Sequence, residues 1–195
     1  MSRHILRTFI AIELAAPLQE SLKDIQDELM NSGADVKWVK PDNIHLTLKF
    51  LGDVSAERID SLIGIIDEVV SNEKSFTFRM THIGAFPKPE HPKIIWAGIT
   101  LGKENIERIV SGLEERLQSI GFEKKARDFF AHVTLGRVRS CANRLALSES
   151  LQNFSFPQGL TQKAKQTILF KSTLTPDGPI YKALMRFDLK QENGD

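Results

Sequence analysis

Two short segments of the chain carry the same pair of reactive side chains. His-Leu-Thr-Leu occupies positions 45–48, and His-Val-Thr-Leu occupies positions 132–135. Successive side chains of a β-strand point to opposite faces, so each segment, as a strand, places its imidazole and its hydroxyl on one face. The apolar residues between them point the other way and can anchor the strand in a core. We therefore expect each segment to present a histidine beside a threonine.

Two imidazoles and two hydroxyls suit an in-line displacement at phosphorus. Histidine has an unperturbed pKa of about 6.5, so it accepts or donates a proton near neutral pH. One imidazole would deprotonate an attacking water while the other protonates the departing oxygen, and each such group typically contributes about 10²–10⁴-fold to the rate. The threonine hydroxyls would donate hydrogen bonds to the phosphate oxygens. This scheme needs no metal ion.

Two plainer interpretations of the motifs remain open. A single His-x-Thr strand is common by chance, and its histidine is more often a hydrogen-bonded structural residue. Histidine is also a frequent zinc ligand, but no HExxH segment and no pair of cysteines accompanies these motifs. The repetition favours a catalytic pair, His45 and His132, although a duplication could also preserve both residues for packing.

The repetition extends beyond the motifs when the chain is displaced by 87 residues against itself. Identical residues then coincide: Ile12 with Ile99, Leu14 with Leu101, His45 with His132, Thr47 with Thr134, and Leu48 with Leu135. The predicted order of strands and helices matches as well. We expect two lobes related by an approximate twofold axis, each offering an equivalent strand to a shared cleft.

The elements that must position these residues alternate along the chain. We predict strands over residues 7–14, 36–39, 44–51, 76–86, 94–101, 131–138, 164–174 and 180–189. Helices are predicted over residues 17–30, 55–70, 103–120 and 143–151. The length suits a single bilobal domain spanning residues 1–195, with residues 191–195 frayed.

Composition limits the class of protein. The chain has 26 basic and 25 acidic residues and a formal net charge of +1, which argues against a protein that grips long nucleic acid without sequence preference. The apolar runs are too short to span a membrane, and no secretory signal is visible. Cys141 is the only cysteine, so an internal disulfide is impossible, and a cytoplasmic location is expected. We interpret Cys141 as a small packing residue.

Several other residues have weaker claims to a role. His4, His82 and His91 lack a threonine two residues on, so we expect them to be surface or structural residues. Strand alternation places Lys49 on the same face as His45, where its charge would add to the site. Two interpretations stay open for a basic cluster, which either borders the cleft or lies in a solvated loop: Lys124, Lys125 and Arg127. The tryptophans, Trp38 and Trp96, suit stacking on a base, but large aromatic residues are more often core residues.

The motifs and their flanks resemble a known family. The segments at 45–52 (HLTLKFLG) and 132–135 (HVTL) resemble the twin HxTx motifs of the two-histidine phosphoesterases. More narrowly, the chain resembles the RNA 2′,3′-cyclic phosphodiesterases, also called 2′-5′ RNA ligases. Residues 7–12 and 181–189 resemble the opening and closing strands of that family, so the resemblance covers nearly the whole chain. One departure is Ala131, where the family often has proline.

The resemblance implies an α+β fold, bilobal, with antiparallel sheets and outer helices around a central cleft. It also implies hydrolysis of a terminal 2′,3′-cyclic phosphate to a 2′-phosphomonoester, with no metal or other cofactor. On the family pattern His45 is the proton donor and His132 the proton acceptor. Thr47 and Thr134 bind the phosphate.

Arg137 matches a family arginine that lies near the substrate. In an ideal strand, the arginine five residues after His132 would point to the opposite face. Its role therefore depends on the strand bending or ending at Gly136.

The resemblance also suggests what the protein binds. The expected partner is RNA with a 2′,3′-cyclic phosphate end, or a small nucleotide, and we expect a monomer with no obligate protein partner and no membrane. Reverse 2′-5′ ligation, another 2′-linked phosphodiester, and a non-catalytic module that binds a nucleotide or RNA end are the alternatives. The motifs contact only the phosphate, so they do not separate these substrates.

Overall fold

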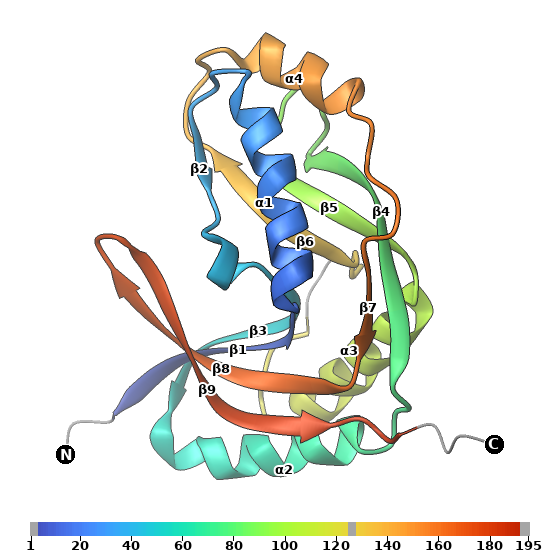
Figure 1. The fold of residues 1–195 in the computed structure, drawn as a ribbon. Coiled ribbons are helices and arrows are strands. Elements are labelled where there is room, and N and C mark those ends of the chain that lie inside the picture. The colour runs from blue at the N-terminus through green and yellow to red at the C-terminus, as the bar shows by residue number, and fades with distance from the viewer. Residues whose placement is uncertain (1–3, 125–127, 192–195) are drawn as a thin grey trace.

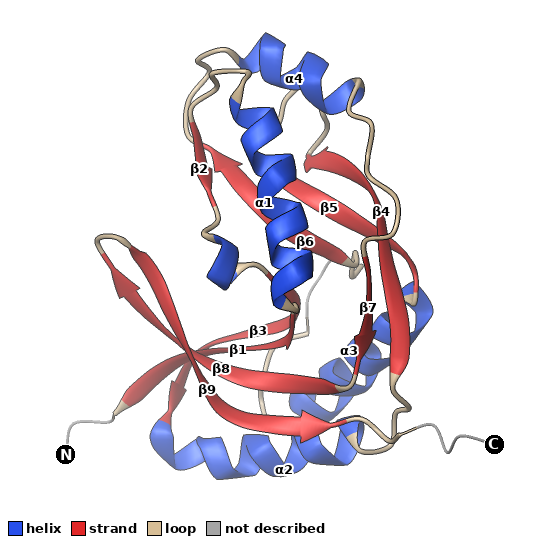
Figure 2. Cartoon of the chain, viewed as in Figure 1, coloured by secondary structure: helices blue, strands red, loops and turns tan. Residues whose placement is uncertain are grey.

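The computed structural model describes residues 4–124 and 128–191, which form an α+β fold (Figures 1 and 2). Its strands are β1 (Ile5–Glu13), β2 (Val36–Trp38), β3 (His45–Ser55), β4 (Phe76–Phe86), β5 (Ile94–Leu101), β6 (His132–Val138), β7 (Thr161–Ala164), β8 (Gln166–Thr175) and β9 (Gly178–Asp188). Its α-helices are α1 (Ala16–Met30), α2 (Ile59–Val70), α3 (Lys103–Gln118) and α4 (Arg144–Gln152), and its short 3₁₀-helices are η1 (Pro41–Asn43) and η2 (Ala56–Arg58). The expected fold class is confirmed. Of residues 191–195, which were predicted to fray, 192–195 lie outside the described part.

The strands form one continuous antiparallel sheet in the order β7-β4-β5-β6-β3-β1-β8-β9, with β2 paired to β6. Its two lobes meet where β3 and β6 pair at a single register position, Leu46 with Val133. One lobe contains β2, β4, β5, β6 and β7, and the other contains β1, β3, β8 and β9. The antiparallel sheets that the resemblance implied for the two lobes are thus parts of one curled sheet.

The two repeats exchange strands. The first repeat supplies β1, β3 and β4, and the second supplies β5, β6 and β8, yet β4 pairs with β5 and β8 pairs with β1. The order β4-β5-β6-β3-β1-β8 is therefore symmetric about the β3–β6 junction. Within it Ile12 pairs with Leu46 as Ala97 pairs with Val133. The structural counterpart of Ile12 is thus Ala97, and the predicted match to Ile99 is wrong.

The chain passes between the lobes at Lys165. Residues 164–174 were expected to form one strand, but β7 ends at Ala164 and β8 begins at Gln166. β7 pairs with β4 in one lobe, whereas β8 pairs with β1 in the other. A single residue therefore separates strands of different lobes, and the composition of the segment shows no boundary.

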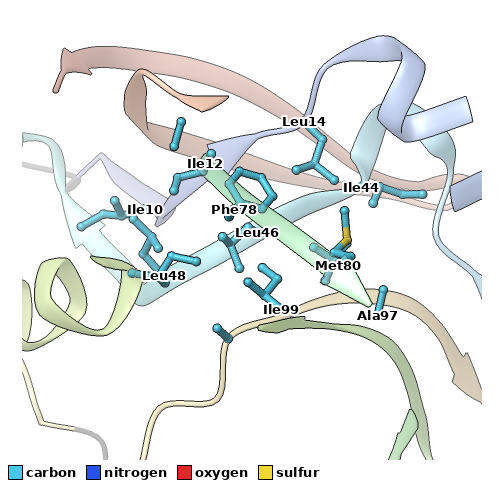
Figure 3. Packing of buried hydrophobic residues seen from close by; sticks show 14 of the residues in the cluster. Ile10, Ile12, Leu14, Ile44, Leu46, Leu48, Phe78, Met80, Ala97 and Ile99 are labelled. Carbon is cyan, nitrogen blue, oxygen red and sulfur yellow. The ribbon is translucent and has the colours of Figure 1, made fainter. Parts of the chain in front are cut away.

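Helices cover one face of the sheet and bury the main core against it. α1 and α4 contact strands β6 and β4, while α2 and α3 contact strands β8, β9 and β3 (Figure 1). Each helix packs an apolar stripe inward, as in α1 with Leu18, Leu22, Ile25 and Leu29. The sheet packs its own apolar side chains against these helices, among them Leu46, Leu48 and Phe78 (Figure 3). Among the described residues no helix is long and apolar enough to cross a membrane.

Candidate active site

The four residues of the twin motifs meet at the junction of the lobes. His45 is the first residue of β3, and His132 is the first residue of β6. The pairing of Leu46 with Val133, continued in antiparallel register, sets His45 opposite Thr134 and Thr47 opposite His132. Directly opposed residues share a face, and diagonal neighbours such as the two histidines lie about 7–8 Å apart in a regular ladder. We call the face that carries these four residues the histidine face. It is the one opposite the helices.

The two imidazoles are held by matching hydrogen bonds. The Nδ1 atom of His45 lies 2.7 Å from the carbonyl oxygen of Asn43, and Nδ1 of His132 lies 2.7 Å from that of Phe130. A carbonyl oxygen only accepts, so each Nδ1 carries the hydrogen. In both rings Nε2 is then the nitrogen that gains or loses a proton. The rings are thus fixed in the same tautomer, each by the residue two positions earlier.

Aromatic side chains enclose His45. The ring of Phe9 lies 4.9 Å from that of His45, and the ring of Tyr181 lies 5.3 Å away in an edge-on arrangement. Phe170 stacks on Phe9 at 5.2 Å. This apolar enclosure lowers the pKa of His45, because burial disfavours the charged ring, and the hydrogen bond to Asn43 opposes the shift only in part.

A second aromatic group encloses His132. Its ring lies 5.2 Å from that of Phe86, 5.9 Å from that of Phe130 and 6.4 Å from that of Trp96. Trp96 is buried, as the core interpretation predicts, but on the histidine face rather than in the helix-covered core. Trp38 does pack against the main core. Sequence reasoning gave no site role to Phe9, Phe86, Phe130 or Tyr181. Phe130 lies two residues before His132, whereas the pairing of distant strands brings the other three to the histidines.

Matching β-bulges follow the two motifs. Ile10 pairs with Lys49 and Ala11 with Thr47, so Leu48 is an extra residue in β3. In β6, Leu135 is extra in the same way. A bulge inserts one residue and reverses the alternation beyond it.

The bulge at Leu135 changes where Arg137 points. Gly136 turns toward the core, where Val36 and Trp38 pack beside it, so Arg137 turns to the histidine face. Arg137 also lies near enough to Tyr181 to influence its phenol: burial raises the pKa of Tyr181, and Arg137, followed by Arg7, opposes the rise. The strand does not have to end at Gly136 for Arg137 to face the histidines.

The expectation for Lys49 is wrong for the same reason. The bulge at Leu48 turns Lys49 into the core, where it is 2% exposed. Its Nζ atom lies 2.5 Å from a carboxylate oxygen of Glu114 on α3 and donates to the carbonyl oxygen of Glu123 at 3.1 Å. Lys49 is therefore half of a buried ion pair behind the site and adds no charge to the histidine face.

The remaining residues singled out in the sequence lie in varied places. His82 is exposed but faces the site, because it pairs with Gly98, which pairs with His132. His4 and His91 are exposed, as predicted. Cys141 is also exposed, so its interpretation as a packing residue is wrong. Of the basic cluster Lys124 is exposed, and Lys125 and Arg127 lie outside the described residues.

Among the described residues, no group of three or more His, Cys, Asp or Glu side chains is placed to hold a metal ion.

Comparison with known proteins assigns the chain to a family. The sequence model of the family described as "LigT like Phosphoesterase" matches residues 12–96 and 100–181. A protein of Methanothermobacter thermautotrophicus named RNA 2′,3′-cyclic phosphodiesterase is 30% identical over 94% of this chain and 99% of its own length. A protein of the same name from Archaeoglobus fulgidus is 33% identical over 94% of this chain and 100% of its own length.

Solved structures share the fold. A crystal structure from Thermus thermophilus superposes with a TM-score of 0.80 at 25% identity and covers 96% of this chain and 100% of its own. Escherichia coli LigT complexed with 3′-AMP gives a TM-score of 0.80 at 24% identity with the same coverage of both chains. On the family match and the extent of these similarities, the chain belongs to the LigT-like phosphoesterase family.

Proposed function

We propose that this phosphoesterase opens the 2′,3′-cyclic phosphate end of RNA to a 2′-phosphomonoester, with His45 as acid and His132 as base and without a metal ion. The names of its relatives support the substrate class. The observation that carries the mechanism is the matched pair of Nδ1 hydrogen bonds, which makes Nε2 the titrating nitrogen of both rings. Binding a nucleotide alone would not need two such groups.

The proposed reaction is an in-line displacement. Nε2 of His132 takes a proton from water, and the water oxygen forms a bond to phosphorus. The bond between phosphorus and the ribose 3′ oxygen breaks, and protonated Nε2 of His45 gives its proton to that oxygen. One water is consumed, the 2′ ester is kept, and the two histidines end with exchanged protonation states.

Three side chains of the histidine face would hold the phosphate. The hydroxyls of Thr47 and Thr134 donate to its non-bridging oxygens, and the guanidinium of Arg137 balances its charge. The bound phosphodiester anion would also favour the protonated form of His45, which the proposed acid needs. Burial favours the neutral ring of His45, whereas a phosphodiester anion beside it favours the protonated ring.

Substitution of each histidine tests the proposal on chelator-treated protein with a nucleoside 2′,3′-cyclic phosphate. Asparagine keeps a donor for the Asn43 or Phe130 carbonyl but cannot exchange a proton. His45→Asn and His132→Asn should each lower kcat/KM by about 10²–10⁴-fold, with an unchanged melting temperature. His91→Asn, at an exposed position, is the matched control. Wild-type rates in either variant, or loss of activity on chelation, would refute the mechanism, and tight binding without product would favour a binding module.

A further inference from the structure

Two cations face each other across strands β2 and β6 beside the site. Lys37 and Arg137 are directly paired residues, and such residues point to the same face. A Cβ atom at Gly136 would lie 2.7 Å from Cγ1 of Val36 and 2.9 Å from Cε3 of Trp38, so these neighbours of Lys37 point to the core side. Lys37 therefore points with Arg137 to the histidine face.

No acidic side chain in the described residues forms a salt bridge with either member of this pair. Both side chains are exposed. Like charges directly opposed across two strands destabilise the sheet. The chain as a whole is almost neutral, with a formal net charge of +1, so the concentration of positive charge is local. An anion between or beside the two side chains would remove the repulsion.

The position of the pair identifies the anion. Arg137 influences the phenol of Tyr181, whose ring contacts that of His45, so Arg137 lies at the phosphate end of the site. Lys37 lies one strand farther out, about 4.8 Å in the direction of the hydrogen bonds. Among the described strands β2 pairs only with β6, so Lys37 lies at the border of the sheet. A chain that leaves the terminal phosphate past Arg137 would next meet Lys37.

We propose that Lys37 binds the phosphodiester on the 5′ side of the terminal nucleotide, so that the enzyme prefers an oligonucleotide end to a mononucleotide. This proposal rests on the proposed function and deepens it. Arg137 holds the cyclic phosphate and Lys37 holds the next phosphate along the strand. The preference follows because a mononucleoside 2′,3′-cyclic phosphate has no second phosphate for Lys37 to bind.

Relative rates on two substrates test this subsite. Wild-type protein and Lys37→Gln are compared on a dinucleotide and a mononucleotide, both ending in a 2′,3′-cyclic phosphate. We expect the ratio of kcat/KM for the dinucleotide to that for the mononucleotide to fall about tenfold in the variant. Lys103→Gln makes the same charge change at the exposed start of α3 and should keep the wild-type ratio. An unchanged ratio in Lys37→Gln would overturn the proposal.

Binding separates failure of the subsite from failure of the proposed function. Affinity for a dinucleotide ending in a 2′-phosphate is measured against salt concentration by fluorescence anisotropy. Loss of one phosphate contact should make the slope of log K against log salt shallower by about 0.7 in Lys37→Gln. If wild-type protein turns over neither substrate but the slope changes, the subsite stands and the proposed function fails. If turnover is present and the slope is unchanged, the subsite fails.

Discussion

Leu46 of β3 and Val133 of β6 are register partners at the junction of the two lobes, and they occupy the same position in the two repeats. The pseudo-twofold axis of the sheet therefore passes between them. Each is flanked by the histidine and the threonine of its motif, so the axis places four polar groups around one point. A phosphoryl group at that point would meet an imidazole from either side.

A symmetric pair of histidines needs an asymmetric surrounding before one can be acid and the other base. The residues that follow the two matched bulges differ, and they provide this asymmetry. The residue two positions after the extra leucine is Phe50 in β3 and Arg137 in β6. At this position, therefore, only the second repeat carries an arginine. We expect this difference to orient the substrate and so to determine which ring faces the leaving oxygen.

The threonine hydroxyls should contribute to the transition state. Thr47→Val and Thr134→Val remove one donor each without changing the shape of the side chain, and each should lower kcat/KM by about 10²-fold. Serine at the same positions keeps a donor and should restore most of the rate. Thr8→Val is the matched control, since the Thr8 hydroxyl is buried without a hydrogen-bond partner. Steady-state kinetics on a nucleoside 2′,3′-cyclic phosphate would measure these changes. Full activity of either site variant would show that its threonine has no part in the mechanism.

The pKa of His45 predicts how stability depends on pH. Burial lowers this pKa in the folded state, whereas the unfolded chain keeps a value of about 6.5. The unfolded state therefore binds more protons, so the contribution of His45 is fully present above pH 6.5 and is lost as the pH falls toward the folded pKa. Urea unfolding between pH 7.5 and 5 should show a smaller loss of stability in His45→Asn than in wild-type protein. An equal loss in both proteins would contradict this prediction, and His91→Asn should behave as wild type.

The elements and the candidate pair of histidines could be predicted from the sequence because both depend on local patterns. Local residue patterns predicted β4 and β5 with the bounds seen in the structure. The repeated His-x-Thr motif marked four residues that the structure brings together at the junction of the lobes. Pairing between distant strands left no such local signal. The exchange of β4 and β8 between lobes, and the aromatic residues that exchange brings to the histidines, follow from contacts far apart in the chain.

Bulges explain the errors around the motifs. The alternation rule places Lys49 with His45 and Arg137 away from His132, and a single extra residue in each strand reverses both expectations. Lys49 is stable inside the core because Glu114 on α3 supplies a carboxylate to pair with its ammonium group. The alternation rule had placed Lys49 on the solvent-facing side with His45. A sequence pattern contains neither the extra residue nor the distant partner.

Breaking the buried ion pair should cost stability. Lys49→Met removes the cation that pairs with the Glu114 carboxylate in the core, which should reduce the free energy of unfolding by about 3–5 kcal/mol. Adding Glu114→Gln to this variant removes the buried carboxylate charge as well and should recover most of the loss. Lys103→Met breaks an exposed pair with Glu107 and should change stability by less than about 1 kcal/mol. Urea unfolding measures all three; a loss in Lys49→Met no larger than in Lys103→Met would contradict the prediction.

Gly98 leaves space for two rings beside His132. A Cβ atom there would lie 2.4 Å from Nε2 of His82 and 2.9 Å from Cζ3 of Trp96. Because Gly98 pairs directly with His132, any shift of these rings moves the enclosure of the proposed base. The absence of a side chain at this position is therefore a condition for the aromatic packing of the second lobe.

Gly98→Ala should consequently harm both stability and turnover. Overpacking typically costs about 1–3 kcal/mol, and displacement of Trp96 should lower kcat as well. His82→Ala in the same chain opens the space next to the new methyl group, so the double variant should recover part of the loss. Gly64→Ala in α2 meets nothing within 4 Å and should stabilise the protein by about 0.5–1 kcal/mol. If Gly98→Ala unfolded at the wild-type urea concentration, the packing of His82 and Trp96 over this glycine would not be the constraint argued from their distances.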